Sequence, residues 1–392
     1  MMSNWKQDIF NNFIKLNRGF DLPEKNIVAG PYPVVASTSI KDMHNNYKVN
    51  PPAVVTGRSG SLGTVQYINS KCWPLNTTLY VKDFKGNNPK FVFYLLKTLR
   101  LENFNSGAGV PSLNQNHLHK LKLNIPPLLI QKKIASILSA YDDLIENNNN
   151  KNAVLERMTE ELYKEWFVRL RFPNYKNTRI VKGVPVGWSI TELREVATEV
   201  SKSTKPGKHL ENRFYLPIEL LGIHSFLPIG HFHYTEAQSS LVLFEQGDIV
   251  FGAMRPYLHK VSLAPFNGIT RTTCFVIRPR SPEYYSWLFL LLFQKASIDY
   301  ATLICNGADR PYAVWNKGFE RMPILLPKKE LTEEFNSQVK PLLEQIQKKY
   351  FIIQNLKQSR DRLLARLMNG KLDVEKLNIH SPLSMLEEEN NA

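Results

Sequence analysis

Apolar residues in two stretches of the chain recur in alternating steps of four and three. The first stripe passes through ten positions from residue 134 to residue 166, and the second through ten positions from 335 to 367. This spacing keeps one face of a helix against a partner helix and is typical of a coiled-coil seam. Each stretch covers about 33 residues, or roughly 50 Å at 1.5 Å per residue. The pattern therefore predicts two long helices.

The two stripes share one register, because adding 201 to each position of the first gives the corresponding position of the second. Agreement over ten positions indicates an internal repeat and favours pairing of the two helices. The seam residues that we single out are Ile134, Leu138, Tyr141, Asn148, Asn152, Leu155, Leu162 and Trp166 in the first helix, and Phe335, Leu342, Ile346, Lys349, Ile353, Leu363 and Leu367 in the second.

Four consecutive asparagines at residues 147–150 interrupt the first stripe, and Asn148 and Asn152 occupy seam positions. Polar seam residues cost stability but specify register and orientation. If the helices pair antiparallel, with Ile134 facing Leu367, Asn152 falls opposite Lys349, so that polar meets polar near the midpoint. The alternative is a frayed break between two shorter helices, because asparagine is a poor residue in a helix interior.

The repeat extends beyond the helices. The segment "NTTLYV", which begins at Asn76, matches "RTTCFV", which begins at Arg271, at an offset of 195. "FVFYLLK" matches "WLFLLLF" at an offset of 196, and Pro126 matches Pro327 at 201. Such slow drift arises when surface loops differ by a few residues. The chain is therefore expected to be two copies of one unit, each a globular domain followed by a long helix.

Each globular half shows strand signals separated by turns. Residues 53–68 predict a strand, a glycine-rich turn and a strand, and residues 247–264 are their counterpart. Short apolar helices are expected at 89–99 and 282–294. We therefore predict a mixed α/β (α+β) fold with a pseudo-twofold internal repeat. The predicted boundaries are a first globular domain at 1–125, a central helix at 126–172, a second globular domain at 173–326, a distal helix at 327–376 and a mobile tail at 377–392.

The net charge of +15 over 392 residues points to a polyanion partner, most often nucleic acid. The excess lies in the globular stretches: residues 1–125 hold 15 basic and 6 acidic side chains, and residues 173–326 hold 17 and 12. The longest apolar run is far shorter than the roughly 20 residues of a membrane span. The start of the chain lacks the apolar core of a signal peptide, and three scattered cysteines suit a reducing compartment. We expect a cytoplasmic protein without membrane contact.

Motifs for catalysis or metal binding are absent from the sequence. It contains no phosphate-binding glycine loop, no HExxH and no serine nucleophile elbow. "NPPA" at residues 50–53 is similar to a methyltransferase motif, but Ala53 cannot stack on a flipped base. His231 and His233 lack a cysteine or carboxylate at a metal-binding spacing. We therefore expect a binding protein with no catalytic residue and no metal site.

Basic and aromatic residues beside glycines occur in corresponding loops of the two halves. Arginine and lysine neutralise phosphates or contact guanine edges, and glycine lets the backbone approach DNA. A single arginine is more often a solvated surface charge, but the paired placement favours these loops as regions. The candidate DNA-binding residues are Arg58, Ser59 and Ser61 in "TGRSGSLG", Arg255, Tyr257 and Lys260 in "MRPYLHK", and Arg310 in "NGADRPY".

Several motifs together resemble the specificity subunit of type I restriction-modification systems, over essentially the whole chain. They are Pro126-Pro127, Gln131, Ile134, Asp142-Asp143 and Lys164-Glu165-Trp166-Phe167, then "VPVGW" from Val184 and "RLLARLMNGKLDV" from Arg362. Two departures occur. Ile130 stands where the family often has glutamate, and the second copy has "KKELTEEF" where a glutamine is expected.

The resemblance implies two target recognition domains, each binding one half of a split, asymmetric site on double-stranded DNA. The two helices would form an antiparallel coiled coil. Methyltransferase subunits that carry S-adenosylmethionine would dock on the helices, and restriction subunits that use ATP and Mg would join them. This chain itself would bind no cofactor, and adenine would be methylated in each half-site. Two alternatives stay open: a specificity subunit of a close-cutting (type IIB-like) system, and a coiled-coil scaffold without a DNA role, which leaves the charge distribution unexplained.

Overall fold

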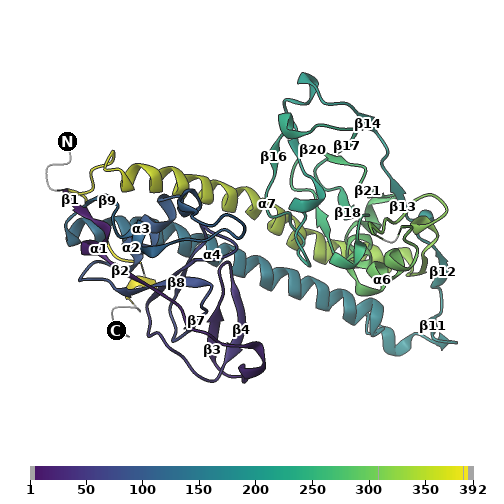
Figure 1. Ribbon diagram of the computed structural model, residues 1–392. Coiled ribbons are helices and arrows are strands. Elements are labelled where there is room, and N and C mark those ends of the chain that lie inside the picture. Colours follow the sequence, from purple (N-terminus) through teal and green to yellow (C-terminus); the bar gives the residue numbers. More distant parts are fainter. Residues whose placement is uncertain (1–4, 308, 383, 387–392) are drawn as a thin grey trace. The chain divides into compact units, whose positions relative to one another are not determined.

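A computed structural model describes residues 5–307, 309–382 and 384–386 of the chain (Figure 1). Two compact units make up the chain. Unit 1 comprises Met1–Glu146 and Leu356–Ala392, and unit 2 comprises Asn147–Asn355. Each unit therefore contains a globular part and a portion of both long helices, and each is described here by itself.

Unit 1 is built on three antiparallel or mixed sheets. The four-stranded sheet has the order β2-β8-β5-β6, and its strands are β2 (Lys15–Arg18), β8 (Thr78–Asp83), β5 (Ala53–Gly57) and β6 (Val65–Ile68). A three-stranded sheet contains β4 (Ile40–His44), β3 (Tyr32–Val35) and β7 (Trp73–Pro74), and a two-stranded sheet pairs β1 (Lys6–Ile9) with β9 (Lys122–Ile125).

The helices of the globular part of unit 1 are α1 (Phe10–Phe13), α2 (Pro89–Thr98) and α3 (Gln115–Leu118). Helix α2 starts where Asn88 accepts a hydrogen bond from the Phe91 amide, with Pro89 in the first helical position. Its apolar face packs on β5 and β6 and fills the core of the unit.

Unit 2 repeats this plan. Its four-stranded sheet has the order β13-β21-β18-β19, with β13 (Ala197–Glu199), β21 (Cys274–Pro279), β18 (Ile249–Gly252) and β19 (Val261–Leu263). The pair β12 (Ser189–Glu192) and β22 (Pro323–Leu326) corresponds to β1 and β9. The two predicted strand–turn–strand segments are β5–β6 and β18–β19. The mixed α/β fold and the internal repeat are thus confirmed.

The remaining elements of unit 2 are larger than their counterparts in unit 1. A five-stranded sheet stands where unit 1 has three strands; it contains β14 (Ser203–Thr204), β17 (Leu241–Phe244), β20 (Gly268–Arg271), β15 (Phe214–Tyr215) and β16 (Phe232–His233). A hairpin pairs β10 (Ile180–Val181) with β11 (Val184–Pro185). The helices are α5 (Tyr285–Phe293) and α6 (Lys295–Leu303).

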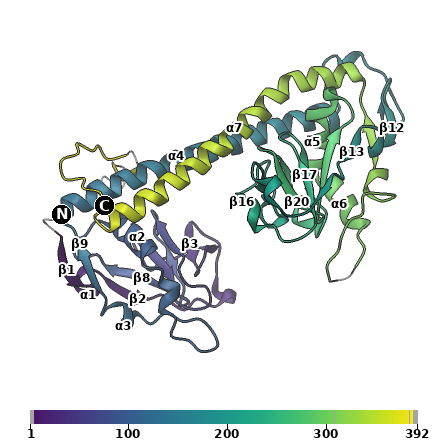
Figure 2. The same cartoon turned by 90° about the horizontal axis from the view of Figure 1, so that it is seen from above.

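Two long helices supply the remaining elements, α4 (Leu128–Tyr163) and α7 (Lys329–Met368) (Figure 2). A π-helical turn, Lys164–Val168, extends α4. Both helices lie inside the predicted stretches 126–172 and 327–376. In the part of the chain that the structure describes, no helix is long and apolar enough to cross a membrane.

Within each unit the two long helices pair antiparallel. In unit 1 the Arg360 guanidinium lies 2.7 Å from an Asp142 carboxylate oxygen, so the end of α7 meets the beginning of α4. In unit 2 the ring centroids of Trp166 and Phe335 are 5.4 Å apart, so the beginning of α7 meets the end of α4.

All of the predicted seam residues are buried or half-buried in the structure, and none is exposed. In α7, however, Leu343 and Tyr350 are more deeply buried than the predicted Leu342 and Lys349. The reason is that α7 also packs on the globular part of unit 2, where the Tyr350 hydroxyl lies 2.6 Å from His231 Nδ1. A stripe in the sequence shows that a helix is buried, but not which surfaces bury it.

The asparagine run does not break the first helix, because α4 is continuous through residues 147–150. The alternative of a frayed break is therefore wrong. Asn152 is only 6% exposed, and among the described residues its side-chain oxygen has no hydrogen-bond partner. Lys349 is half-buried, and burial together with the charge of Lys151 lowers its pKa. A role of Asn152 in setting the register stays a prediction.

Much of the segment expected to be a mobile tail is docked on unit 1. The Lys133 ammonium donates to the carbonyls of Glu375 at 2.6 Å and Leu377 at 2.8 Å. The Ser384 hydroxyl donates to Asp143 at 2.8 Å, and Met385 is buried in the core of the unit. The acidic residues near the end of the chain predicted a mobile tail, but the apolar side chain of Met385 is buried in the core of unit 1. Residues 383 and 387–392 lie outside the described residues.

Candidate nucleic-acid interface

Two loops of unit 1 are joined backbone to backbone at one end of the four-stranded sheet. The first connects β5 to β6 over residues 58–64, and the second covers residues 105–113. The Gly60 amide donates to the Pro111 carbonyl at 2.9 Å, and the Leu113 amide donates to the Arg58 carbonyl at 2.8 Å. These bonds fix the first loop on the second, so that their side chains share one surface.

Unit 2 contains the same frame, bond for bond. The loop that connects β18 to β19, residues 253–260, is joined to residues 306–313. The Arg255 amide donates to the Pro311 carbonyl at 2.8 Å, and the Ala313 amide donates to the Ala253 carbonyl at 2.9 Å. The expectation that the candidate loops are equivalent regions of two copies therefore agrees with their backbone geometry.

The frame also aligns the individual residues, and the arginines of the two loops do not coincide in it. Arg58 corresponds to Ala253, and Arg255 corresponds to Gly60. Gly60 and Arg255 both have left-handed backbone, with φ of +83° and +52°. Glycine adopts this conformation freely, whereas arginine does so at a cost. In the aligned loops the two arginines therefore occupy positions that differ by two residues. This alignment comes from the hydrogen bonds and cannot be read from the sequence.

A second arginine, which the sequence analysis missed, accompanies Arg58. Arg58 Nε donates to the Asn76 carbonyl at 3.0 Å, and Arg18 Nε donates to the same carbonyl at 3.3 Å. Burial, and then the charge of Arg18, lower the pKa of Arg58. Two guanidinium groups that converge on one acceptor favour a bound anion nearby. Arg18 lies on β2, 40 residues before Arg58, so no local signal in the sequence links them.

The serines of the first loop differ in their surroundings. The Ser59 carbonyl accepts a hydrogen bond from the Ser37 hydroxyl at 3.1 Å, and Ser59 is half-buried. Ser61 is exposed. A Cβ atom at Gly57 would overlap the Ser61 carbonyl oxygen, so only glycine fits at that position. The loop is thereby held in one shape that presents Ser61 to solvent.

The second loop presents an aromatic residue between basic ones. Tyr257 is 54% exposed, and Arg255 and Arg310 are exposed as well. The Arg255 guanidinium donates to the Asp309 carbonyl at 3.5 Å, which places Arg255 beside the loop that carries Arg310. The fold therefore brings together two arginines that are 55 residues apart in the sequence.

Lys260 differs from the other candidates because its ammonium group already has partners. It donates to the carbonyl of Ile218 at 2.9 Å and to that of Glu219 at 3.5 Å. These bonds tie the end of the loop to the segment between β15 and β16 of the five-stranded sheet. Lys260 is accordingly better placed to support the loop than to contact a ligand.

The two histidines weighed as metal ligands have separate partners. His231 Nδ1 lies 2.6 Å from the Tyr350 hydroxyl, and His233 Nδ1 lies 2.8 Å from the Thr235 hydroxyl. Among the described residues, no group of three histidine, cysteine, aspartate or glutamate side chains is placed to hold a metal ion. Ala53 of "NPPA" is buried in β5.

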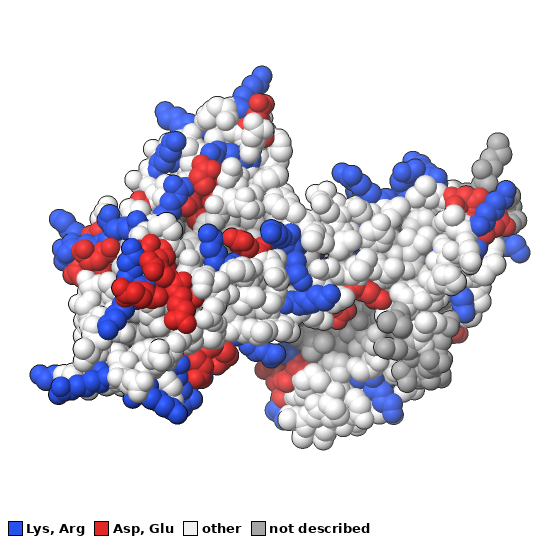
Figure 3. Space-filling model, turned by 180° about the vertical axis from the view of Figure 1, so that it is seen from behind, with Lys and Arg blue, Asp and Glu red and all other residues white. Residues whose placement is uncertain are grey.

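Basic side chains on the face drawn in Figure 3 stand at many separate places, with acidic side chains among them. No continuous basic stripe covers this face. The two pairs of loops therefore remain the candidate places where basic side chains contact DNA.

Comparisons with known proteins give a consistent result. Residues 2–157 match the family model of the type I restriction modification DNA specificity domain. The MjaIX specificity subunit of Methanocaldococcus jannaschii is 28% identical over 308 residues, which is 74% of this chain and 70% of that protein. The EcoDI specificity subunit of Escherichia coli is 21% identical over 95% of this chain and 89% of that protein. The crystal structure of a type I S subunit from M. genitalium superposes with a TM-score of 0.62 at 16% identity, covering 93% of this chain and 96% of that one.

Proposed function

This chain belongs to the family of specificity subunits of type I restriction-modification systems, which are non-catalytic and work with partner enzyme subunits; from that premise we propose that it selects a split, asymmetric DNA site. Residues 1–125 bind one half of the site, and residues 173–326 bind the other. The partners are directed to methylate adenine in each half-site or to cleave DNA.

The observation that carries this proposal is the duplicated loop frame. Both units hold two loops together by the same backbone hydrogen bonds and present basic side chains from them. A fixed backbone with variable side chains suits sequence recognition, because arginine placed at a defined point distinguishes guanine from other bases. Arg58 and Arg255 leave the frame at different positions. The two halves of the DNA site should accordingly differ in sequence, and the whole site should not be a palindrome.

The partners supply the chemistry. Methyltransferase subunits provide S-adenosylmethionine, and restriction subunits use ATP and Mg to translocate and cut DNA. The present chain contributes recognition and an assembly platform formed by α4 and α7. Exposed residues on these helices away from the seam are available to the partners.

Methylome sequencing tests the proposal. The chain is expressed with the methyltransferase subunit encoded beside it, in a host without adenine methylation, and modified adenines are identified by long-read sequencing. A split motif with one methylated adenine in each half is expected. If the complex is soluble and the methyltransferase subunit is competent, but no adenine is methylated, the coiled-coil scaffold would be the better account.

A further inference from the structure

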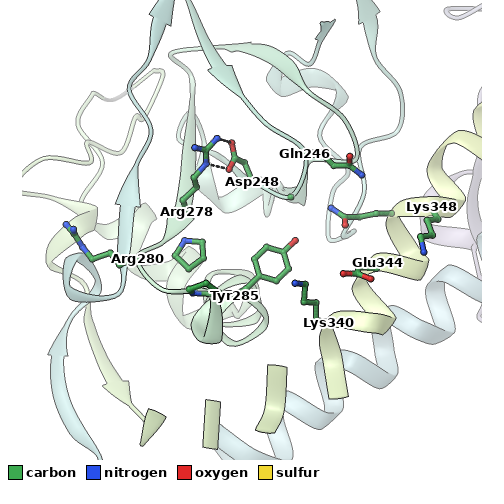
Figure 4. A pocket seen from close by; sticks show the side chains of 12 residues that line it. Gln246, Asp248, Arg278, Arg280, Tyr285, Lys340, Glu344 and Lys348 are labelled. Carbon is green, nitrogen blue, oxygen red and sulfur yellow. Dashed lines mark hydrogen bonds and ion pairs between the residues drawn. The ribbon is translucent and has the colours of Figure 1, made fainter. Parts of the chain in front are cut away.

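A recess of about 670 Å³ in unit 2 lies between the four-stranded sheet and helix α7 (Figure 4). Its sheet side is formed where β18 begins and β21 ends, by Asp248 and Arg278, and Tyr285 at the start of α5 forms its floor. Lys340, Glu344 and Lys348 of α7 form the opposite wall, and in Figure 4 the Lys340 side chain points toward the Tyr285 ring.

The recess has excess positive charge. Arg278 and Asp248 neutralise each other through a two-pronged ion pair, one arm of which is 2.8 Å long. Lys340 and Lys348 form no ion pair or hydrogen bond with the described residues. A carboxylate of Glu344 lies between them along the helix. The wall from α7 therefore offers two free ammonium groups and one free acceptor.

A repeat-related position in unit 1 shows what kind of molecule fits such a helix face. Glu344 corresponds to Asp143 at the offset of 201 that relates α7 to α4. In unit 1 residues 374–382 and 384–386 contact this face of α4, from Lys133 to Asp143. The matching face of α7, at residues 337, 341, 344 and 348, is exposed and bare among the described residues.

The recess and the candidate DNA loops lie at opposite ends of the same strands. Strand β18 begins at Ile249, next to the recess, and ends at Gly252, directly before the loop of residues 253–260. A molecule in the recess therefore leaves the loop surface free.

We propose that this recess binds an extended acidic segment of a partner subunit, so that it adds a docking point for the complex beside the seam helices. The inference rests on the proposed function. Acidic side chains of the segment pair with Lys340 and Lys348, and its backbone amides donate to Glu344. A polypeptide has donors and acceptors to match both kinds of group. DNA phosphates have acceptors only, and Glu344 would repel them.

The test compares two charge reversals in the full chain. The recess variant is Lys340→Glu with Lys348→Glu, and the matched control is Lys176→Glu with Lys182→Glu, which changes the same charge on exposed residues of unit 2. Binding of the co-encoded methyltransferase subunit is measured by biolayer interferometry, and binding of a DNA duplex by fluorescence anisotropy. Neutral Lys340→Gln with Lys348→Gln serves if the reversal unfolds unit 2.

The recess variant is expected to bind the methyltransferase subunit roughly tenfold more weakly than the control does, with equal effects of both variants on DNA binding. Equal partner binding by recess variant and control would overturn the proposal. So would a larger loss of DNA binding in the recess variant, which would make the recess a DNA contact. Methylation of a split site by the unmodified chain is measured in parallel; if it is present while the recess variant behaves as the control, only the docking proposal fails.

A photo-crosslinking amino acid in place of Glu344 provides a second readout in the assembled complex. Mass spectrometry should identify a segment of a partner subunit rich in aspartate and glutamate. A crosslink confined to DNA, or to a segment without acidic residues, would contradict the proposal.

Discussion

Arg58 and Arg255 are the residues on which recognition should depend most, because each leaves a loop that is fixed by backbone hydrogen bonds. A bidentate arginine–guanine contact contributes about 1–3 kcal/mol of discrimination. We predict that Arg58→Ala relaxes one position in one half of the DNA site, and that Arg255→Ala relaxes one position in the other half. Anisotropy titrations on duplexes with single substitutions measure both effects.

Arg179→Ala is the control for these variants, since Arg179 is exposed and lies outside the two loops. It should leave the preference for the site unchanged. If Arg58→Ala and Arg255→Ala weaken all sequences alike and only reduce the salt dependence, both arginines contact phosphates. If neither changes affinity or preference, the loop assignment is wrong.

Glu156 on α4 gives unit 2 a dependence on pH. Its pKa is raised to about 7. Burial is the main cause; a hydrogen bond from the Phe226 amide at 3.3 Å opposes it, and the charge of nearby Glu160 adds to it. The folded state therefore holds this proton more tightly than the unfolded state does. Its contribution to stability is complete below pH of about 4.5 and is lost as the pH rises toward about 7.

We predict that Glu156→Gln, which keeps an oxygen for the Phe226 amide, stabilises the chain at pH 8 by up to a few kcal/mol and has little effect at pH 4.5. Denaturant titrations at both pH values measure this difference. Glu161→Gln, at an exposed glutamate paired with Lys164 and Arg169, is the control. Equal effects of Glu156→Gln at the two pH values would contradict the assignment.

At the residue scale, the sequence predicted the loops but not their internal geometry. Arg58 follows Gly57 and Arg255 lies close to Tyr257, and basic residues beside glycine or aromatic residues stand out in a sequence. Their displacement by two residues depends on which amides pair across the loops, and Arg18 reaches Asn76 only because β2 and β8 are neighbours in the sheet. Neither fact has a signature in the order of residues.

Among the elements, α2, α4 and α7 of unit 1 meet at one half-buried carboxylate. Asp142 accepts a hydrogen bond from the Tyr94 hydroxyl at 2.6 Å and pairs with Arg360 at 2.7 Å. Burial, and then the charge of Asp142, raise the pKa of Tyr94, so the hydroxyl stays protonated and donates. The carboxylate thus links the sheet-covering helix to both helices of the coiled coil.

We predict that Asp142→Ala destabilises unit 1 by about 1–3 kcal/mol, because it leaves the half-buried Arg360 charge and the Tyr94 hydroxyl without this partner. Asp361→Ala is the matched control: Asp361 also pairs with Arg360, but its side chain is 63% exposed, and its loss should cost about 0–1 kcal/mol. Calorimetric melting measures both variants. Similar losses would show that Asp142 does not connect the three helices.

The docked end of the chain makes a separate prediction for unit 1. Met385 is 4% exposed in the core, whereas its neighbour Leu386 is 43% exposed. Met385→Ala should cost about 2–5 kcal/mol, and Leu386→Ala much less. Hydrogen exchange along residues 133–143 of α4 should rise only in the first variant. Equal exchange in both would favour the mobile tail expected from the sequence.

At the element scale, the strict stripe predicted both long helices and their shared register. It could not reveal that Leu343 and Tyr350 face the globular part of unit 2, because an apolar side chain one position off a seam suits packing on either surface. The run of asparagines at residues 147–150 suggested a possible break in the first helix, which does not occur. Asparagine disfavours an isolated helix, but packing along the whole length of α4 outweighs that preference.

For the whole molecule, the repeat supports the proposal that one chain recognises two unlike half-sites. The four-stranded sheets and the loop frames are shared by the units, while the second sheet has three strands in unit 1 and five in unit 2. The shared parts keep the loops in place, and under this proposal the unshared parts give each unit its own sequence preference. Segments that match at a nearly constant offset predicted the duplication. The extra strands of unit 2 are too short and irregular to be recognised in the sequence.

The most direct test of this account exchanges one half of the chain. Residues 1–125 are replaced by the corresponding segment of another specificity subunit, and the methylome is sequenced with the same methyltransferase partner. We predict that one half of the methylated motif changes to that of the donor while the other half stays as it was. A motif in which both halves change, or in which neither changes while the complex stays active, would contradict recognition of separate half-sites by the two units.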